Sequence, residues 1–268
     1  MADTITERQQ GILERLEAGR TCSYAELAGA WQVSEMTIRR DVDRLAGTGA
    51  LVKILGGVYR PREAEHLYET ALESRLSECV AEKRAIAALA VTLAATCETI
   101  YLDGGTTCIH LARRIARDEV AISVVTHSPM VCLELARSER VKVIGLGGEL
   151  DANSLCFFGT SCEAAAHECY VDHAFLTTKG FLPAEGTYES FAGTARIKQI
   201  MVGQSATVTL LIDHSKFGRR ALRKVVNASQ INTVVTDDSV DGQLLASARE
   251  HGCNVLVAPV DSRQQQKE

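Results

Sequence analysis

The stretch VSEMTIRRDVDRLAGTG, residues 33–49, contains the most informative pattern of the chain. At about 100° per residue, three apolar side chains fall on one stripe of a helix, which we expect to face a core. They are Ile38, Val42 and Leu45. Arg40 and Arg44 point the opposite way, and Thr37 and Arg39 lie on the flanks. The exposed face of this helix therefore carries cations that can reach an anionic partner.

The residues around this helix predict a helix-turn-helix unit with a wing. Ser23-x-x-Glu26 forms a capping box before a helix, and Ser34 caps the next helix after a short break at Gln32-Val33. LVKILGGVYR, residues 51–60, predicts two short strands around a glycine turn. Cations at the start of a second helix and on a wing suit the major groove of DNA. The predicted DNA-binding residues are Ser34, Thr37, Arg39, Arg40, Arg44 and Lys53. The alternative is a small helical packing module whose arginines are solvated.

Charge and composition limit the possible partners. The formal net charge is −5, and residues 1–60 balance eight Lys and Arg against eight Asp and Glu. Binding to DNA would therefore depend on the local placement of cations. No apolar run approaches the ~18 residues of a membrane helix, and the N-terminus lacks a secretory pattern. Nine cysteines without CxxC spacing favour reduced thiols and a cytoplasmic location, with no membrane partner.

From about residue 82, helical stretches alternate with short apolar runs. The runs are TIYL, AISVV, VKVIGL, VDHAFLTT, TVTLLI, INTVV and NVLVA. This alternation predicts βαβ units and a mostly parallel sheet with helices on both faces. Glycine and polar residues follow most of these runs, at the carboxyl ends of the strands, where open α/β sheets bind ligands.

DGGTT, residues 103–107, is the most specific of these strand-end segments. Two glycines allow backbone N–H groups to turn inward, two threonines add hydroxyl donors, and a helix begins beside them. The segment lacks the lysine of a nucleotide P-loop and the spacing of a dinucleotide-binding motif. Together with Lys216 it favours a small phosphorylated ligand, and the alternative is a tight strand-to-helix connection.

Two parts of the chain resemble the DeoR family of bacterial transcriptional regulators. VSEMTIRRDVDRLAGTGALVKILGG is similar to the N-terminal signature of that family. EKRAIA, LDGGTT, VVTHS, LGGEL, ARIKQIM and DHSKFGR are similar to its sensor domain. Gly104 and His127 stand where the family usually has serine and asparagine, and Lys53-Ile54-Leu55 departs from its wing. DHSKFGR resembles the glycerol-3-phosphate-responsive branch of the family.

The resemblance implies an α/β protein: an N-terminal winged helix-turn-helix followed by a mostly parallel α/β sensor domain similar to ribose-5-phosphate isomerase-like folds. It also implies a sugar-phosphate effector. The candidate effector-binding residues are Asp103, Gly104, Gly105, Thr106, Thr107, Thr126, Gly148, Asp172, Lys179, Lys198, Asp213 and Lys216. Two have structural alternatives, since Lys198 can lie on a solvated helix face and Asp213 can cap a turn.

Two other kinds of site are alternatives to a sensor. An isomerase would need a poised carboxylate, and Asp172, Lys179 and Glu189 could be recruited, yet no second acid follows Asp172 within one turn. A metal site could use nearby thiols and imidazoles, but buried thiols and a surface histidine explain them as well. These residues are Cys162, His167, Cys169 and His173. We therefore expect no enzyme, no cofactor and no metal.

The expected protein is a repressor-type transcription factor for sugar or polyol metabolism. Its partners would be double-stranded operator DNA, a small phosphorylated sugar or polyol, and further copies of itself in a homodimer or homotetramer. The expected boundaries are 1–60 for the winged helix-turn-helix, 61–78 for a linker, 79–260 for the sensor domain and 261–268 for a polar tail. The alternative is a sugar-phosphate isomerase-like enzyme fused to a DNA-binding domain.

Overall fold

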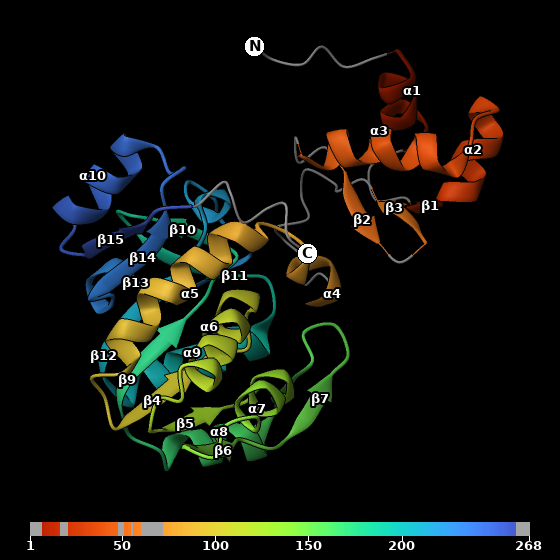
Figure 1. Ribbon diagram of the computed structural model, residues 1–268. Coiled ribbons are helices and arrows are strands. Elements are labelled where there is room, and N and C mark those ends of the chain that lie inside the picture. Colours follow the sequence, from red (N-terminus) through yellow and green to blue (C-terminus); the bar gives the residue numbers. More distant parts are fainter. Residues whose placement is uncertain (1–6, 17–20, 48–50, 55, 60–71, 261–268) are drawn as a thin grey trace. The chain divides into compact units, whose positions relative to one another are not determined.

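The computed structural model describes residues 7–16, 21–47, 51–54, 56–59 and 72–260 (Figure 1). The chain divides into two compact units, Met1–Glu65 and His66–Glu268. Within the described residues, no helix is both long enough and apolar enough to cross a lipid bilayer.

The N-terminal unit contains three helices and a small antiparallel sheet, as the sequence predicts for a winged helix-turn-helix. Its helices are α1 (Glu7–Arg15), α2 (Tyr24–Trp31) and α3 (Glu35–Gly47). Its strands are β1 (Thr21–Ser23), β2 (Val52–Ile54) and β3 (Gly57–Tyr59), in the order β1-β3-β2. Strands β2 and β3 form the predicted wing, and β1 is an additional strand that pairs with β3.

Local hydrogen bonds set the boundaries of these helices. The Ser23 hydroxyl accepts from the N–H of Glu26 (3.1 Å), and the N–H of Ser23 donates to the Glu26 carboxylate (2.7 Å), which completes the predicted capping box. Helix α2 ends at Gln32 in the left-handed conformation (φ 50°). The Ser34 hydroxyl then accepts from the N–H of Thr37 (3.2 Å) at the start of α3.

The apolar stripe of α3 is buried as predicted. Ile38 and Val42 are fully buried, and Leu45 is 1% exposed. They pack in a core with residues of the other two helices and the sheet. Asp41 on the same helix accepts hydrogen bonds from Arg8 (2.6 Å) and Gln9 (3.1 Å) of α1. Packing and this polar contact together hold α3 against the unit, so its opposite face is left for other partners.

The C-terminal unit is built on a seven-stranded sheet in the order β15-β14-β12-β9-β4-β5-β6, with every neighbouring pair parallel. The strands are β4 (Thr99–Leu102), β5 (Ile122–Thr126), β6 (Val141–Gly145), β9 (Val171–Leu176), β12 (Ser205–Leu211), β14 (Thr233–Asp237) and β15 (Asn254–Ala258). The seven apolar runs predict these seven strands, and the prediction is confirmed. Their carboxyl ends lie along one side of the sheet, which we call the carboxyl edge.

Helices cover both faces of this sheet (Figure 1). One face packs against α5 (Val80–Ala94), α6 (Thr106–Arg117) and α7 (Pro129–Leu135), and also against α4 (Leu72–Leu76). The other face packs against α8 (Thr160–His167), α9 (Ala192–Gly203) and α10 (Gly242–Glu250). Strand β4 serves both cores, since Tyr101 joins one while Ile100 and Leu102 join the other.

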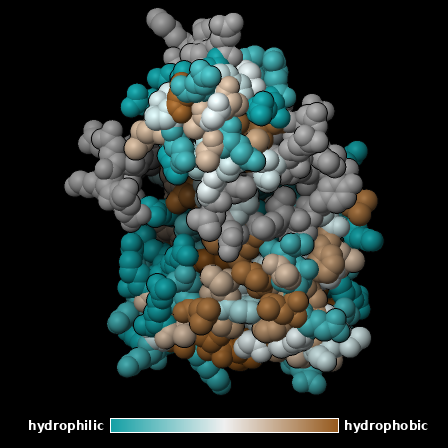
Figure 2. Space-filling model, turned by 90° about the vertical axis from the view of Figure 1, so that its right-hand side faces the viewer, coloured by the Kyte–Doolittle hydropathy of each residue, from teal (hydrophilic) through white to brown (hydrophobic). Residues whose placement is uncertain are grey.

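Several elements of this unit were not predicted. A hairpin of β7 (Glu149–Asp151) and β8 (Cys156–Phe158) follows the sheet strand β6. A second antiparallel sheet contains β10 (Gly180–Leu182), β11 (Gly186–Glu189) and β13 (Arg223–Asn227). Two short 3-10 helices, His214–Lys216 and Ala228–Gln230, occur in the connections. Apolar side chains gather on part of the face shown in Figure 2. Among the exposed large apolar residues, Leu133 lies in α7 and Leu150 in β7.

The predicted linker, residues 61–78, contains structure at its end. Residues 61–71 lie outside the described residues, as does the predicted tail, 261–268. Leu72 of α4 is 2% exposed and packs in the core beneath α5 and α6, and its N–H donates to the carbonyl of Asn153 (2.8 Å). By packing, α4 is therefore a part of the C-terminal unit.

Candidate functional site

The outer face of α3 carries two arginines that the fold does not use. Arg40 and Arg44 are exposed, and within the described part of the chain neither side chain has a hydrogen bond or an ion pair. A spacing of four residues places them on the same face, opposite the buried stripe. Both guanidinium groups are therefore available to phosphates or to guanine edges.

The other predicted DNA-binding residues have partners inside the unit. The Arg39 guanidinium lies over the ring of Tyr24, 4.2 Å from its centroid, and its Nη2 is 3.6 Å from Glu35. Lys53 Nζ donates to Asp43 (2.9 Å). The hydroxyls of Ser34 and Thr37 lie 2.9 Å apart at the start of α3. The structure therefore separates the two neighbouring arginines, one held by the fold and one free.

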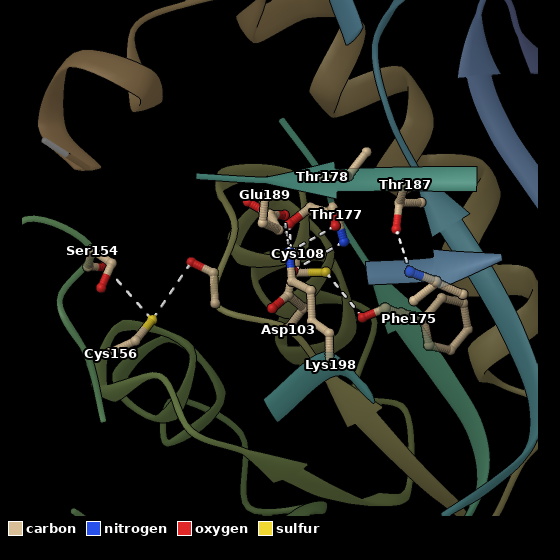
Figure 3. Close-up of polar contacts among 12 residues, drawn as sticks. Asp103, Cys108, Ser154, Cys156, Phe175, Thr177, Thr178, Thr187, Glu189 and Lys198 are labelled. Atoms are coloured by element: carbon tan, nitrogen blue, oxygen red, sulfur yellow. Dashed lines mark hydrogen bonds and ion pairs between the residues drawn. The ribbon is translucent and has the colours of Figure 1, made fainter. Parts of the chain in front are cut away.

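At the carboxyl edge of the large sheet, a lysine and two carboxylates form a buried cluster (Figure 3). Lys198 Nζ of α9 is 3.1 Å from Asp103 at the end of β4 and also pairs with Glu189 of β11. It donates to the carbonyl of Thr177 as well (2.8 Å). All three charged residues are at most 3% exposed. The alternative that Lys198 lies on a solvated helix face is therefore wrong.

The charges of this cluster stabilise one another. Burial alone would lower the pKa of Lys198, but the Asp103 and Glu189 carboxylates raise it above its ordinary value. Burial opposes the charge of Asp103 too, yet Lys198 and the Thr177 hydrogen bonds lower the pKa of that carboxyl. Asp103 accepts from both the N–H (3.0 Å) and the hydroxyl of Thr177. The cluster therefore joins the loops after β4 and β9 to α9 and β11.

Residues 103–105 connect β4 to α6, which begins with Thr106 and Thr107. We call residues 103–107, the segment predicted to bind a phosphorylated ligand, the cradle. Gly105 precedes the helix in an extended conformation (φ −76°), with no side-chain cap on the first N–H groups. The N–H groups of Thr106 and Thr107 thus lack intrahelical acceptors. Within the described residues, the hydroxyls of these threonines also have no hydrogen-bond partner. Donors and the positive end of the α6 dipole converge here, as an anion requires.

Close packing explains the two glycines of the cradle. A Cβ on Gly105 would collide with the side chain of Thr177, and a Cβ on Gly104 would collide with the sulfur of Cys156. The glycines thus let the cradle approach the loop after β9 and strand β8. The Cys156 thiol is inert, because burial raises its pKa to about 12.

The loop after β12 contributes a second group of charges to the carboxyl edge. Asp213 accepts from the N–H of Ser215 (3.0 Å), which confirms that it caps a turn. Burial opposes its charge, but Lys216 lowers the pKa of Asp213. Lys216 is half-buried, and its side chain has no hydrogen bond or ion pair to another described residue.

Lys83 is a buried cation near this loop that was not predicted as a site residue. Its Nζ donates to the carbonyls of Arg75 and Glu78, each at 2.6 Å, and Asp213 acts on its charge. Burial lowers the pKa of Lys83. Lys83 belongs to the segment EKRAIA, which resembles the family's sensor domain. That resemblance is the signal in the sequence that could have identified Lys83 as a site residue.

The end of β5 adds Thr126 and His127 to the carboxyl edge. Thr126 is fully buried, and its hydroxyl accepts from the N–H of Ser128 (3.2 Å). His127 Nδ1 lies 2.9 Å from the Tyr101 hydroxyl. Burial lowers the pKa of His127 to about 4, so the imidazole is neutral at pH 7. At this position, where the family usually has asparagine, the chain therefore carries a buried and uncharged imidazole.

The remaining predicted residues are less closely joined to the cradle. Asp172 lies at the amino end of β9, opposite the carboxyl edge, and its carboxylate accepts from the N–H groups of Thr99 (2.8 Å) and Glu98 (3.1 Å). The structure therefore does not bring Asp172 to the other candidates. Gly148 lies in the connection from β6 to β7, where a Cβ would collide with the carbonyl of Phe158. Lys179 is half-buried in the loop after β9.

The thiols and imidazoles considered for a metal have other contacts. Cys162 is buried and its sulfur lies 3.3 Å from the carbonyl of Phe157. Nε2 of His173 lies 2.6 Å from the Thr209 hydroxyl. Across the described ranges, no group of three or more His, Cys, Asp or Glu side chains is arranged to hold a metal ion.

Both units match described protein families. Residues 8–64 match the DeoR-like helix-turn-helix domain, and residues 78–238 match the DeoR C terminal sensor domain. The fold and these matches define a transcriptional regulator with a helix-turn-helix unit and a sensor unit. The chain belongs to the DeoR family.

Similar proteins include regulators of sugar operons. The lactose phosphotransferase system repressor of Streptococcus mutans is 30% identical over 89% of this chain and 94% of its own length. The putative aga operon transcriptional repressor of Escherichia coli O157:H7 is 26% identical over 94% of this chain and 93% of its own. The L-fucose operon activator of Escherichia coli K12 is 27% identical over 86% of this chain and 94% of its own length. Among solved structures, ribose 5 phosphate isomerase A from Neisseria gonorrhoeae aligns with a TM-score of 0.39 and 19% identity, covering 52% of this chain and 53% of that chain.

Proposed function

We propose that the protein represses an operon of sugar or polyol metabolism and that a phosphorylated sugar or polyol controls it. Relatives named for lactose and L-fucose support the metabolic class. The proposed DNA contact is the outer face of α3, where Arg40 and Arg44 are free. One recognition helix contacts few base pairs, so the proposed active form is a homodimer or homotetramer on repeated half-sites of double-stranded operator DNA.

The observation that carries the effector proposal is the set of unused donors around the start of α6. The phosphate would accept from the backbone N–H groups and hydroxyls of Thr106 and Thr107, with Gly105 leading into the helix. Lys216 would supply a cation from the loop after β12, because its ammonium makes no hydrogen bond or ion pair to another described residue.

Lys198 has a different proposed role. Its ammonium already serves Asp103, Glu189 and the Thr177 carbonyl, so we assign it to positioning the cradle and not to direct contact with the effector. Asp103 acts in the same way through Thr177, against which Gly105 packs. The buried cluster thus fixes the loops before the ligand arrives, which lowers the entropic cost of binding.

A thermal-shift screen with sugar phosphates and their unphosphorylated counterparts tests this proposal. A ligand at about 100 times its dissociation constant stabilises the folded state by ~2.7 kcal/mol, which gives a measurable rise in melting temperature. The phosphorylated member of a pair should give the larger rise. Thr106→Ala should reduce that advantage and leave the operator affinity of the unliganded protein unchanged. Preference for free sugars, or for nucleotides over every sugar phosphate, would contradict the proposal.

An enzymatic function remains the second candidate, because the fold places two carboxylates and a lysine together at the carboxyl edge. An isomerase would need one carboxylate free to move a proton. Asp103 and Glu189 are instead paired with Lys198 and are at most 3% exposed. Incubating each bound sugar phosphate with the protein and following it by NMR distinguishes the candidates, since a regulator returns the ligand unchanged.

A further inference from the structure

Met36 is a large apolar side chain that the fold leaves in solvent. It is 70% exposed, more than any other large apolar residue of the described segments. It is not a member of the apolar core of its own unit. Single exposed apolar residues are common on protein surfaces, so exposure alone assigns no role. The position of Met36 on α3 makes its exposure informative.

Met36 lies on the outer face of α3, one helical turn before Arg40. Residues four apart share a face, so Met36, Arg40 and Arg44 form one row along the helix, on the side opposite Ile38 and Val42. Met36 is the second residue of the helix and therefore lies at the N-terminal end of that row. In helix-turn-helix proteins, the N-terminal residues of the second helix contact base edges in the major groove.

The polar side chains beside Met36 are less free to contact bases. Glu35 faces Arg39, and the Arg39 guanidinium lies over the Tyr24 ring. Thr37 is half-buried, and its hydroxyl lies 2.9 Å from that of Ser34. At the N-terminal end of the row, the group left to reach into a groove is thus the unbranched thioether of Met36.

We infer that Met36 contacts the 5-methyl group of a thymine in the operator, next to the base pair that Arg40 contacts. The inference rests on the proposed binding of α3 to operator DNA. The thymine methyl is the apolar group that base pairs present in the major groove, and apolar side chains recognise thymine through it. Methionine suits such a contact because its flexible chain adapts to the position of the methyl group. Met36 would thus specify thymine at the base pair next to the one that Arg40 contacts.

Removing single methyl groups from the operator tests this contact. The operator is first defined by in vitro selection with the full-length protein, and each thymine is then replaced in turn by deoxyuridine, which lacks only the 5-methyl group. We expect the wild-type protein to lose about three- to fivefold in affinity at one or two positions of each half-site, the effect of one buried methyl-sized group. Met36→Ala should bind the natural operator more weakly and lose this sensitivity to deoxyuridine.

Two controls make the result specific. Leu222→Ala removes another exposed apolar side chain, 62% exposed and located in the C-terminal unit, and should keep the full deoxyuridine sensitivity. Circular dichroism melting should show that Met36→Ala folds normally, since the side chain lies outside the core. The inference is overturned if the wild-type protein has no methyl-sensitive thymine, or if Met36→Ala retains the sensitivity, including the case in which Met36 serves a protein partner. Failure of selection to yield any specific operator would instead refute the proposed function itself.

Discussion

Arg39 and Arg40 are neighbours in the sequence, but their surroundings predict different contributions to DNA binding. Arg40 is free on the outer face of α3 and should contact a base edge, so Arg40→Ala should cost about 1–3 kcal/mol of specific binding and reduce discrimination between sequences. Arg39 is held by Tyr24 and Glu35, so we expect it to contact the phosphate backbone of the DNA and not a base edge. Arg39→Ala should weaken binding to operator and random DNA equally and lower the slope of log K against log salt by about 1.

Fluorescence anisotropy titrations at several salt concentrations, with operator and random duplexes, measure both effects. Unchanged binding of both variants would contradict the assignment of α3 as the DNA-binding helix. Equal loss of discrimination in both variants would show that Arg39 leaves Tyr24 on binding. Both variants should fold, because neither side chain belongs to the buried stripe.

Lys198 and Lys216 both lie at the carboxyl edge, but only Lys198 is essential to the stability of the fold. Lys198→Met leaves two carboxylates buried without their cation and should cost about 3–5 kcal/mol in the free energy of unfolding. Lys216→Met removes a half-buried lysine that makes no hydrogen bond or ion pair to a described residue but favours the charge of the buried Asp213, so it should cost less, about 1 kcal/mol. Lys216→Met should instead weaken binding of the phosphorylated effector.

Urea unfolding monitored by far-ultraviolet circular dichroism measures this difference. The single tryptophan, Trp31, lies in the N-terminal unit, so its fluorescence reports separately on that unit and should be unaffected by either variant. Lys198→Met with wild-type stability would mean that the buried cluster does not hold the cradle.

At the scale of elements, the sequence predicts the central sheet because its strands are short, mainly apolar runs, and the inner strands β4, β5, β9, β12 and β14 are largely buried. Polar or glycine residues follow most of the seven runs in the sequence. Because these residues lie at the carboxyl ends of the strands, they indicate where the candidate site is. The strands β10, β11 and β13 were missed because they are short and mixed in character, as in Arg223–Asn227. The pairing of Lys198 with Glu189 and Asp103 depends on how α9, β11 and β4 pack, which no local pattern contains.

The end of β5 should make the stability of the sensor unit depend on pH. The folded pKa of His127 is about 4, lowered by burial from its ordinary value of 6.5. Between these pH values the unfolded chain binds one more proton than the folded chain, so stability falls as the pH falls, by about 1.4 kcal/mol per unit for each such histidine. His110 and His173 also have pKa values of about 4 and add to the slope.

His127→Asn tests this contribution, because asparagine is the usual family residue and does not titrate. The variant should lose less stability than the wild type between pH 6.5 and pH 4, which urea unfolding at a series of pH values measures. His251→Asn makes the same substitution at an exposed position and is measured over the same pH series for comparison. A variant slope equal to that of the wild type would mean that His127 is not buried as a neutral imidazole.

At the scale of the whole molecule, the N-terminal unit and the sensor unit have separate cores. Under the proposed function each unit binds its own ligand, and regulation requires that the two equilibria be coupled. If the effector changes the operator affinity by a given factor, the operator must change the effector affinity by the same factor. For a repressor that its effector releases, both affinities fall, by roughly 5- to 150-fold in typical allosteric proteins.

The two factors can be measured independently with the full-length protein. Gel-shift titrations with and without saturating effector give the first, and calorimetric titrations of effector with and without saturating operator duplex give the second. A scrambled duplex should leave the effector affinity unchanged, and Thr106→Ala should reduce the response to effector without changing operator affinity in its absence. Agreement of the two factors would establish direct coupling within this chain. An effector that binds the sensor unit but leaves operator affinity unchanged would refute the proposed control, because a ligand without differential affinity for two states cannot shift their equilibrium.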